Sequence, residues 1–492
     1  MLKSSVYRED NCLKNANSDI HTKNGNKCGV QIFCSSGIQK EDENMEDAHV
    51  LDMTKGSPVR LLLRFTIPLF LGNLLQQLYN LADTSIAGNL LGDAALSQIG
   101  ATAALYSLIT NAAFGLNNGL ALTVSRHFGA GDKKKMKQAV CWMLVLSAVS
   151  AFLMTVGFLV FERPILHALR VPSNLMDGAY AYLTIILAGI PLTMAYNLEA
   201  SLLQAVGNSM TPLKFLLFSS LLNVGLDFLF MKPLAMGVRG AAIATILAQG
   251  ISAVLIFVYI VRKYPQLRFG KEELHVTKNF VWEMYWTGLS MALMSTVYNI
   301  GSVILQGSIN ALGDVYIAAQ VGGRRLAEFF YIPGQALGTS MATYASQNYG
   351  AGKGGRIRKG VWTAILLYGI WWILALVIVI FFASGAVRAI TGSTNSEVIR
   401  NGALYLKISI PMIPPMAVLV IVRNALQGMR HSVSPLICST LELVGKVIFA
   451  CLIVPAIGYV AVCICEPVTW VICFVFIVAV AFHYRSEFVG ED

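Results

Sequence analysis

The sequence is short of charge. Only 13% of its 492 residues are Asp, Glu, Lys or Arg, whereas 55% are hydrophobic. A soluble chain of this length carries about a quarter charged residues. The shortage excludes an ordinary soluble enzyme and indicates that most of the surface faces lipid.

Several chemical motifs are also missing. No GxxxxGK[ST] loop is present, so transport driven by a nucleotide is not expected. No Ser-His-Asp or metal-hydrolase arrangement is visible, and the Cys463–Cys465 pair lacks a second ligand pair. The net charge of +10 sits in short loops between apolar runs, which argues against a nucleic-acid partner. We therefore expect no enzyme activity, no cofactor and no conventional metal site.

Long apolar runs are what the chain does have. A run of about 18 residues or more crosses the roughly 30 Å hydrocarbon layer as a helix, and lipid forces such runs to satisfy their own backbone groups. The expected spans are 60–86, 95–124, 138–161, 176–200, 212–232, 239–261, 279–309, 315–346, 360–383, 399–425, 434–454 and 459–483.

The chain repeats itself. The segment LGDAALSQIG at 91–100 returns in outline at 312–321, and FGAGDKKKMKQAV at 128–140 returns at 349–361. Because six helices separate the copies, both halves enter the membrane in the same direction. The sequence thus predicts an all-α integral membrane protein with 12 transmembrane helices, in two six-helix bundles related by a pseudo-two-fold axis along the membrane normal.

The division of the chain follows from this repeat. We expect a disordered tail at 1–54, without the apolar segment of a signal peptide, then a first lobe at 55–262. A cytoplasmic loop at 263–278 leads to a second lobe at 279–485 and a short tail at 486–492. Most Lys and Arg lie in the loops on the side of both termini, which predicts that both termini are cytoplasmic.

Polar residues on the first span form one helix face. Gln76, Tyr79, Asn80 and Asp83 are spaced i, i+3, i+4 and i+7 in an otherwise apolar helix. Amides and hydroxyls there often serve only helix packing, and that alternative stays open for the first three. A carboxylate inside the membrane is expensive and rarely needed for packing, so Asp83 is a candidate functional residue.

Three further residues lie at a similar depth in the first half. Asn223 and Asp227 are four apart on the fifth span, and Thr245 lies on the sixth. Two carboxylates, an amide and a hydroxyl suit a hard cation such as Na⁺, whereas two close carboxylates also retain a proton. We predict an ion-coupling site at Asp83, Asn223, Asp227 and Thr245, for Na⁺ or H⁺.

The second half differs at the matching place. Tyr298 and Asn299 repeat the polar face of the first span, but Ser302 stands where Asp83 would be. Glu442 and Lys446 are four apart, in the order that favours an ion pair within a helix. This pair is either a neutralised structural pair or a substrate-facing one. The coupling chemistry is therefore expected in the first half.

Other charged residues in the spans have plainer interpretations. Arg325 and Glu328 are three apart and are expected either to pair with each other near the outer end or to line the cleft. Arg423 and Glu199 lie near the cytoplasmic ends of their helices, where snorkelling or an interfacial position accounts for them. Glu466 precedes Pro467 and is interpreted as stabilising a kink.

The motifs together resemble a known family. KGSPVRLLLRFTIPLFLGNLLQQLYNLADTSIAGNLLG, the following GAGD and the later QNYGAGK are similar to the multidrug and toxic compound extrusion (MATE) family over residues 53–483. In the DNA-damage-inducible (DinF-like) branch, the four residues matching Asp83, Asn223, Asp227 and Thr245 form one linked set. The resemblance also implies that Gln76, Tyr79 and Asn197 line a cavity of the first lobe.

The resemblance implies a secondary multidrug efflux antiporter of the cytoplasmic membrane. Its substrates would be cationic or amphipathic small organic molecules, exchanged for Na⁺ or H⁺ by a monomer. The predicted substrate cavity comprises Gln76, Tyr79, Asn80, Asn197, Tyr298 and Asn299. Two alternatives remain: a flippase for a lipid-linked precursor, which needs more helices and several cavity arginines, and a non-transporting membrane sensor, which needs a soluble output domain.

Overall fold

The computed structural model describes residues 50–169 and 171–489, and these are helical with short connections. Most of the predicted tail, residues 1–49, lies outside the described residues, as do 490–492. The described residues begin ahead of the boundary expected at 54. Met53 is fully buried, and its backbone N–H donates to Oε1 of Gln347 at 2.9 Å.

The first half contains seven helices that make six crossings of the described bundle. Two consecutive helices form one crossing, bent by 46° where Gly189 separates them and Pro191 follows. The helices are α1 (Pro58–Leu91), α2 (Asp93–Gly129), α3 (Lys133–Ala168), α4 (Ser173–Ala188), α5 (Ile190–Ala205), α6 (Met210–Met231) and α7 (Val238–Lys263). Two short 3₁₀ turns, η1 (Pro265–Leu267) and η2 (Lys271–Leu274), lie in the connection to the second half.

The second half repeats this plan with two broken crossings. A 3₁₀ turn at Pro411 interrupts one, and a π-helical segment interrupts another just before Pro455. The elements are α8 (Lys278–Asn310), α9 (Asp314–Gly350), α10 (Gly354–Thr391), α11 (Ser396–Ser409), η3 (Ile410–Met412), α12 (Ile413–Gly428), α13 (Val433–Ile448), η4 (Phe449–Ile453), α14 (Val454–Ile457), α15 (Tyr459–His483) and η5 (Arg485–Phe488).

The crossings match the twelve predicted from hydropathy, with one instructive exception. Among the described residues, ten continuous or nearly continuous helices are long and apolar enough to span a membrane, and the bent α4–α5 pair is an eleventh. The remaining crossing, α9, is 37 residues long, as α2 is. It carries too many polar residues to be recognised as a membrane span from its composition. Its backbone is mostly enclosed by neighbouring helices, so a polar sequence is tolerated there.

The internal repeat is visible in the backbone. Gly131 and Gly352, from the two GAG motifs, both adopt a left-handed conformation, with φ of 69° and 72°. Glycine tolerates this conformation without steric cost, so it ends one helix and aims the next in the same way in both halves. The two six-helix bundles are thus built alike.

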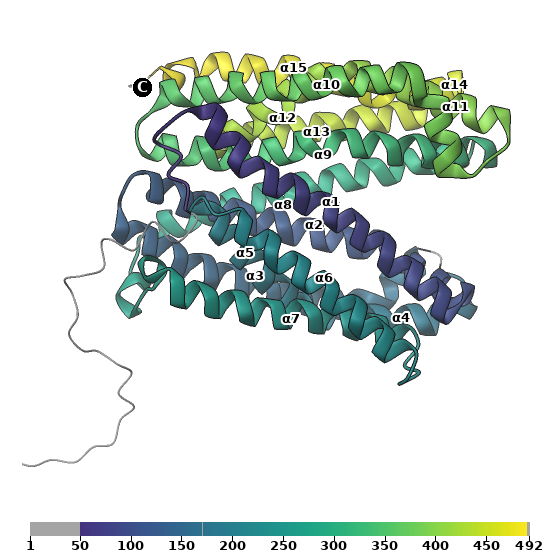
Figure 1. Cartoon of the computed structure of the whole chain (residues 1–492), viewed down its shortest axis with the longest axis horizontal. Helices are drawn as coiled ribbons and strands as arrows, with labels where there is room; N and C mark the ends of the chain where they lie inside the picture. The colour runs from purple at the N-terminus through teal and green to yellow at the C-terminus, as the bar shows by residue number, and fades with distance from the viewer. Residues whose placement is uncertain (1–49, 170, 490–492) are drawn as a thin grey trace, which may run out of the picture. The chain divides into compact units, whose positions relative to one another are not determined.

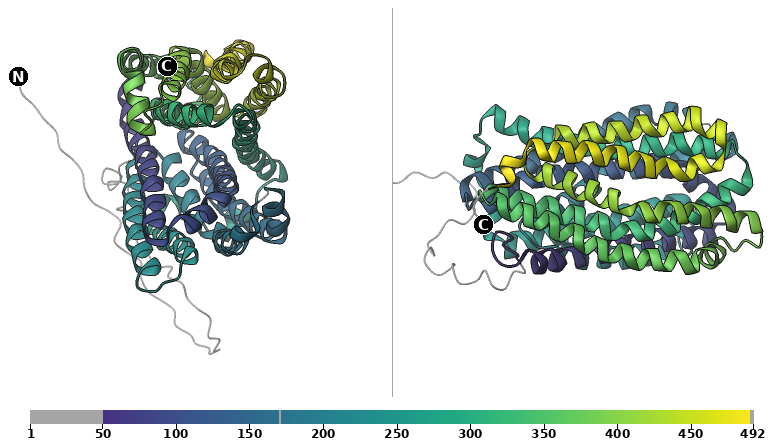
Figure 2. Two further views of the ribbon diagram at one scale, coloured as in Figure 1. Left: turned by 90° about the vertical axis from the view of Figure 1, so that its right-hand side faces the viewer. Right: turned by 90° about the horizontal axis from the view of Figure 1, so that it is seen from above.

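Figures 1 and 2 show the two halves of residues 50–489 lying side by side, with the helices of each half running along a common direction. The first helix joins them. Leu62 and Phe65, near the start of α1, belong to the buried core of the second half, whereas Ala87 packs in the first half. Thr66 also donates to Oγ of Ser340 on α9 at 2.7 Å. The predicted first lobe therefore begins inside the core of the second.

Large apolar side chains cover the outside of the bundle. Phe152 and Val160 on α3, and Ile370 and Phe381 on α10, are more than half exposed. In water such a surface would drive aggregation, whereas in a bilayer it contacts acyl chains. The outer surface therefore agrees with the prediction of a membrane protein.

The most extensive contact between the halves runs along α2 and α8. A Cβ atom at Gly119 would lie 2.6 Å from Cα of Gly288. Small residues allow two helix backbones to touch, which is the usual way of packing helices in lipid. This contact between α2 and α8 holds the two halves together.

Candidate functional site

One end of the bundle is closed by contacts between the halves. We call it the closed end: α1 begins there, and α2 and α9 end there. Oγ of Ser346 donates to the carbonyl oxygen of Leu122 at 2.7 Å, and Nε2 of Gln347 donates to that of Ala205 at 3.0 Å. A Cβ at Gly350 would lie 1.9 Å from the carbonyl oxygen of Arg126, so the repeated GAG motifs meet directly.

Ion pairs reinforce the closed end. Nη1 of Arg126 on α2 lies 3.0 Å from Oε1 of Glu283 on α8, and Arg430 contacts the other oxygen of the same carboxylate. Arg126 is 6% exposed, whereas the Glu283 side chain reaches solvent, so water still screens part of this interaction. Together these contacts close the passage between the halves at this end.

A cavity of about 400 Å³ lies next to the closed end and reaches toward the middle of the bundle. The first half contributes parts of α2 and α5, and the second half contributes α8, α9, α12, α13 and α15. Its polar lining is rich in carboxamides, and Arg423, Glu442 and Glu466 are its charged members. The carboxamides and aromatics lining it are Asn111, Phe114, Asn118, Gln204, Tyr298, Asn299, Tyr331, Gln335, Asn424, Gln427 and Trp470.

The four residues predicted to couple ions lie together in the first half. The amide orientation that satisfies Asn223 lets its nitrogen donate to Oδ2 of Asp227 at 2.9 Å and to the Tyr79 hydroxyl at 3.2 Å. Its oxygen then accepts from the backbone N–H of Thr245 at 3.1 Å. The carboxyl groups of Asp83 and Asp227 lie within hydrogen-bonding reach of each other. We call Tyr79, Asp83, Asn223, Asp227 and Thr245 the first-half cluster.

This cluster has unmet hydrogen-bonding capacity. Oδ1 of Asp83 and Oδ1 of Asp227 are both buried and have no hydrogen-bond partner among the described residues. Two ionised carboxylates this close repel each other strongly in a low-dielectric interior. The pair therefore needs a shared proton or a bound cation, and its oxygen-rich surroundings fit either. No group of three or more His, Cys, Asp or Glu side chains in the described part of the chain forms a conventional metal site.

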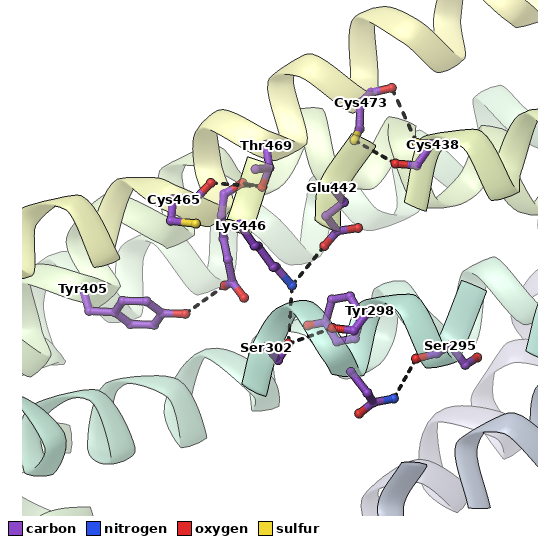
Figure 3. A network of polar contacts seen from close by, with 12 residues as sticks. Ser295, Tyr298, Ser302, Tyr405, Cys438, Glu442, Lys446, Cys465, Thr469 and Cys473 are labelled. Carbon is purple, nitrogen blue, oxygen red and sulfur yellow. Dashed lines mark hydrogen bonds and ion pairs between the residues drawn. The ribbon is translucent and has the colours of Figure 1, made fainter. Parts of the chain in front are cut away.

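The equivalent region of the second half contains its own cation. Nζ of Lys446 lies 3.3 Å from Oε1 of Glu442 and 3.4 Å from Oγ of Ser302 (Figure 3). The same nitrogen lies 3.9 Å from the ring centroid of Tyr298. Lys446 is 1% exposed. We call Tyr298, Ser302, Glu442, Lys446 and Glu466 the second-half cluster.

Glu466 belongs to this cluster rather than to a helix kink alone. It is buried, faces the cavity, and its Oε2 accepts a hydrogen bond from the Tyr405 hydroxyl at 2.9 Å. The sequence interpretation missed this role, although a signal was present. In the repeat, Glu466 on α15 occupies the position of Thr245 on α7, counted from the matching glycines Gly237 and Gly458.

Three smaller expectations need correction. Glu328 forms its ion pair with Arg324, at 3.1 Å, and not with Arg325. Arg324 is four residues before Glu328, a spacing that places both side chains on the same face of the helix. Arg423 does not only snorkel to the surface: it lines the cavity, and its buried Nε has no partner among the described residues. Glu199 is 7% exposed, so its side chain lies inside the bundle and not on the outer surface.

The predicted substrate residues separate into two groups. Tyr298 and Asn299 line the cavity, as does Glu442. Gln76, Tyr79, Asn80 and Asn197 do not. Gln76 donates to Oδ1 of Asn80 at 3.2 Å on an exposed stretch of α1. In this conformation, the first-half polar face therefore lies apart from the cavity.

Comparison with known proteins agrees with this architecture. The family model for MatE matches residues 68–229 and 289–452, one segment in each half. The chain belongs to the MatE family. Members of this family are transporters rather than enzymes, so the twelve helices and the two clusters are parts of a transport protein.

Individual relatives of this MatE-family chain are distant. It is 29% identical to the probable multidrug resistance protein YpnP of Bacillus subtilis, over 62% of this chain and 68% of that protein. It is 22% identical to an FAD transporter of Shewanella oneidensis, over 81% and 88%. A solved structure of the outward-facing conformation of a multidrug resistance MATE family transporter of the MOP superfamily superimposes with a TM-score of 0.81 at 20% identity, covering 92% of this chain and 99% of that one.

Proposed function

We propose that the protein is a secondary multidrug efflux antiporter that exchanges a small organic molecule for Na⁺ or H⁺. The observation that carries the proposal is the pair Asp83 and Asp227, whose Oδ1 atoms are both buried and lack partners among the described residues. A membrane protein gains nothing in stability from two such groups. A site that alternately gains and loses a cation does need them.

The first helix links this pair to the closed end. Its beginning is bound to the second half through Thr66 and Ser340, and its later part places Asp83 beside Asp227 on α6. A cation or proton shared by the two carboxylates removes most of their mutual repulsion and favours close packing of α1 against α6. Loss of the ion restores repulsion and frees the later part of α1. Ion exchange is thereby connected to rearrangement between the halves.

The cavity indicates the class of substrate. Its aromatic and carboxamide lining suits a flat molecule with a few polar groups, and Glu442 and Glu466 favour positive charge. We propose cationic or amphipathic small organic molecules, carried by a monomer in the cytoplasmic membrane with both termini inside. The closed end is then the cytoplasmic end, and the structure corresponds to the state that releases substrate outward.

The flippase alternative fits the cavity less well. A lipid-linked pyrophosphate would require several cationic side chains, and Arg423 is the one arginine among the described lining residues. The sensor alternative lacks support as well, because the loops between the described helices are short.

The decisive experiment is dye efflux from proteoliposomes under an imposed Na⁺ gradient or, separately, an imposed pH gradient. One of the two gradients should drive efflux by the wild type. Asp83→Asn should insert normally yet lose gradient-driven efflux. Undiminished efflux by that variant would contradict the proposal.

A further inference from the structure

The ammonium group of Lys446 is held in the way a bound cation would be. A carboxylate, a hydroxyl and an aromatic face surround it, at 3.3, 3.4 and 3.9 Å (Figure 3). These are the groups that proteins use to bind small cations and alkylammonium ions. The side chain reaches them without solvent exposure.

The position of this ammonium in the internal repeat is informative. Lys446 lies as far from the start of α13 (Val433) as Asn223 lies from the start of α6 (Met210). Asn223 bonds to Tyr79, and Lys446 lies over Tyr298, the corresponding tyrosine. The ammonium group therefore lies at the position in the repeat that Asn223 occupies in the first-half cluster.

Charge balance explains why a cation is needed there. Glu442 and Glu466 are both buried, and Arg324 is paired with Glu328. A buried carboxylate whose partner is removed becomes an uncompensated charge. Lys446 supplies the compensating charge for Glu442 permanently because it is covalently attached.

We propose that Glu442, Ser302 and Tyr298 form a monovalent-cation site that Lys446 fills with its own ammonium group. An exchangeable metal ion or alkylammonium ion would occupy this site if the side chain were removed. Consequently the second half exchanges no ion during transport. That last consequence rests on the proposed antiport, whereas the cation site does not.

The test measures cation binding without transport. The parent protein is the full chain carrying Asp83→Asn and Asp227→Asn, which removes the first-half site. Its melting temperature in detergent should not change when NaCl, LiCl or KCl replaces N-methyl-D-glucamine chloride at constant ionic strength. When Lys446→Met is added to this parent, the melting temperature should rise with the logarithm of the cation concentration. The reason is that a cation which binds only the folded protein stabilises it.

A matched variant distinguishes the site from a general salt effect. Glu442→Gln added to Lys446→Met removes the carboxylate as well, and the cation dependence should disappear. The proposal is overturned if Lys446→Met responds to none of these cations or to pH alone, since Glu442 would then merely take up a proton. Equal cation dependence with and without Glu442 also overturns it.

A second variant covers the case in which Lys446→Met does not fold. Lys446→Ala leaves space for a short amine, so propylammonium chloride during purification should restore a monodisperse protein, whereas tetrapropylammonium, which is too large, should not. A variant that stays aggregated with every amine and metal cation contradicts the proposal. Lys446→Arg keeps the charge and should fold without added cations. These results do not depend on efflux, so failure of wild-type transport would contradict only the proposed function.

Discussion

The two halves of the molecule hold related clusters with opposite electrostatic solutions. In the first half, Asp83 and Asp227 face each other, and no described side chain supplies a positive charge between them. In the second half, Lys446 lies between Glu442 and Ser302. The same arrangement of helices therefore supports either an exchangeable ion site or a permanently neutralised one. We infer that a duplicated fold can assign coupling to one half while keeping both halves packed.

The largest expected effect is in the first-half cluster. Asp227→Asn removes one of the two repelling carboxylates and with it the need for an exchangeable cation. Ion-driven dye efflux should fall by roughly tenfold or more, the usual scale of a coupling free energy. Proteoliposome efflux under a Na⁺ or pH gradient measures this. Ser302→Asn, at the place in α8 that matches Asp83 in α1, should retain the ion dependence; if both variants behave alike, the asymmetry is wrong.

The second prediction concerns stability in the second-half cluster. Glu442→Gln alone leaves the buried ammonium of Lys446 without its carboxylate partner, which should cost about 3–5 kcal/mol. Combining it with Lys446→Met removes the orphaned charge and should recover most of that loss. Thermal unfolding in detergent reports both values. A double variant no more stable than Glu442→Gln would show that the pair is not energetically coupled.

The third prediction compares Thr245 with Glu466, which occupy matching positions in the repeat. Thr245→Val should raise the ion concentration needed for half-maximal efflux by about tenfold, because the ion loses its contact with the threonine hydroxyl. A factor of about ten corresponds to the free energy of one hydrogen bond to a charged group. Glu466→Gln should instead raise the half-saturating concentration of a cationic dye by roughly fivefold, because its neutral amide still packs against Tyr405. Kinetic titrations of ion and dye separate the two. A Glu466→Gln change in ion dependence would count against the assignment of coupling to the first half.

The smallest expected effect lies in the loops that repeat between the halves. Asp132 precedes α3, and its Oδ1 accepts a hydrogen bond from the backbone N–H of Lys135 at 3.0 Å. That bond lowers the pKa of Asp132 below its ordinary value. A lowered pKa means that the cap stabilises the helix at pH values above the ordinary one, and that this is lost as the pH falls through the folded-state pKa.

Replacing Asp132 by Ala should therefore weaken the first turn of α3 by about 1 kcal/mol near neutral pH, with less effect in acid. Hydrogen exchange of that turn at both pH values is the measurement. Lys353, at the matching place before α10, makes no capping bond with its side chain. Lys353→Ala should leave the first turn of α10 unchanged, and equal protection loss in both halves would contradict this difference.

Much of the architecture could be predicted because lipid imposes a simple rule on sequence. Apolar runs located the crossings, and the GAG motifs located the repeat, since both patterns are local. The path of α1 could not be predicted. Leu62 and Phe65 are equally suited to either core, so only the three-dimensional packing shows that they belong to the second half.

The sequence predicts those site residues that interrupt the apolar face of a single helix. It misses a residue whose role depends on a partner from a different helix. Asp83 stood out on α1, and Asn223 and Asp227 stood out on α6, because each interrupts an apolar face. Glu466 was attributed to a kink, since its partner Tyr405 lies on α11, far away in sequence. Pairing helices by their place in the repeat would have set Glu466 beside Thr245 and revealed it.

The central claim is that only the first half exchanges an ion, and the number of ions bound per chain tests it most directly. Equilibrium dialysis with radioactive Na⁺, together with proton release measured on the purified protein at neutral pH, counts bound Na⁺ and H⁺. We predict one exchangeable ion per wild-type chain and none in the Asp83→Asn, Asp227→Asn double variant. Two exchangeable ions in the wild type, or one retained by the double variant, would contradict the account.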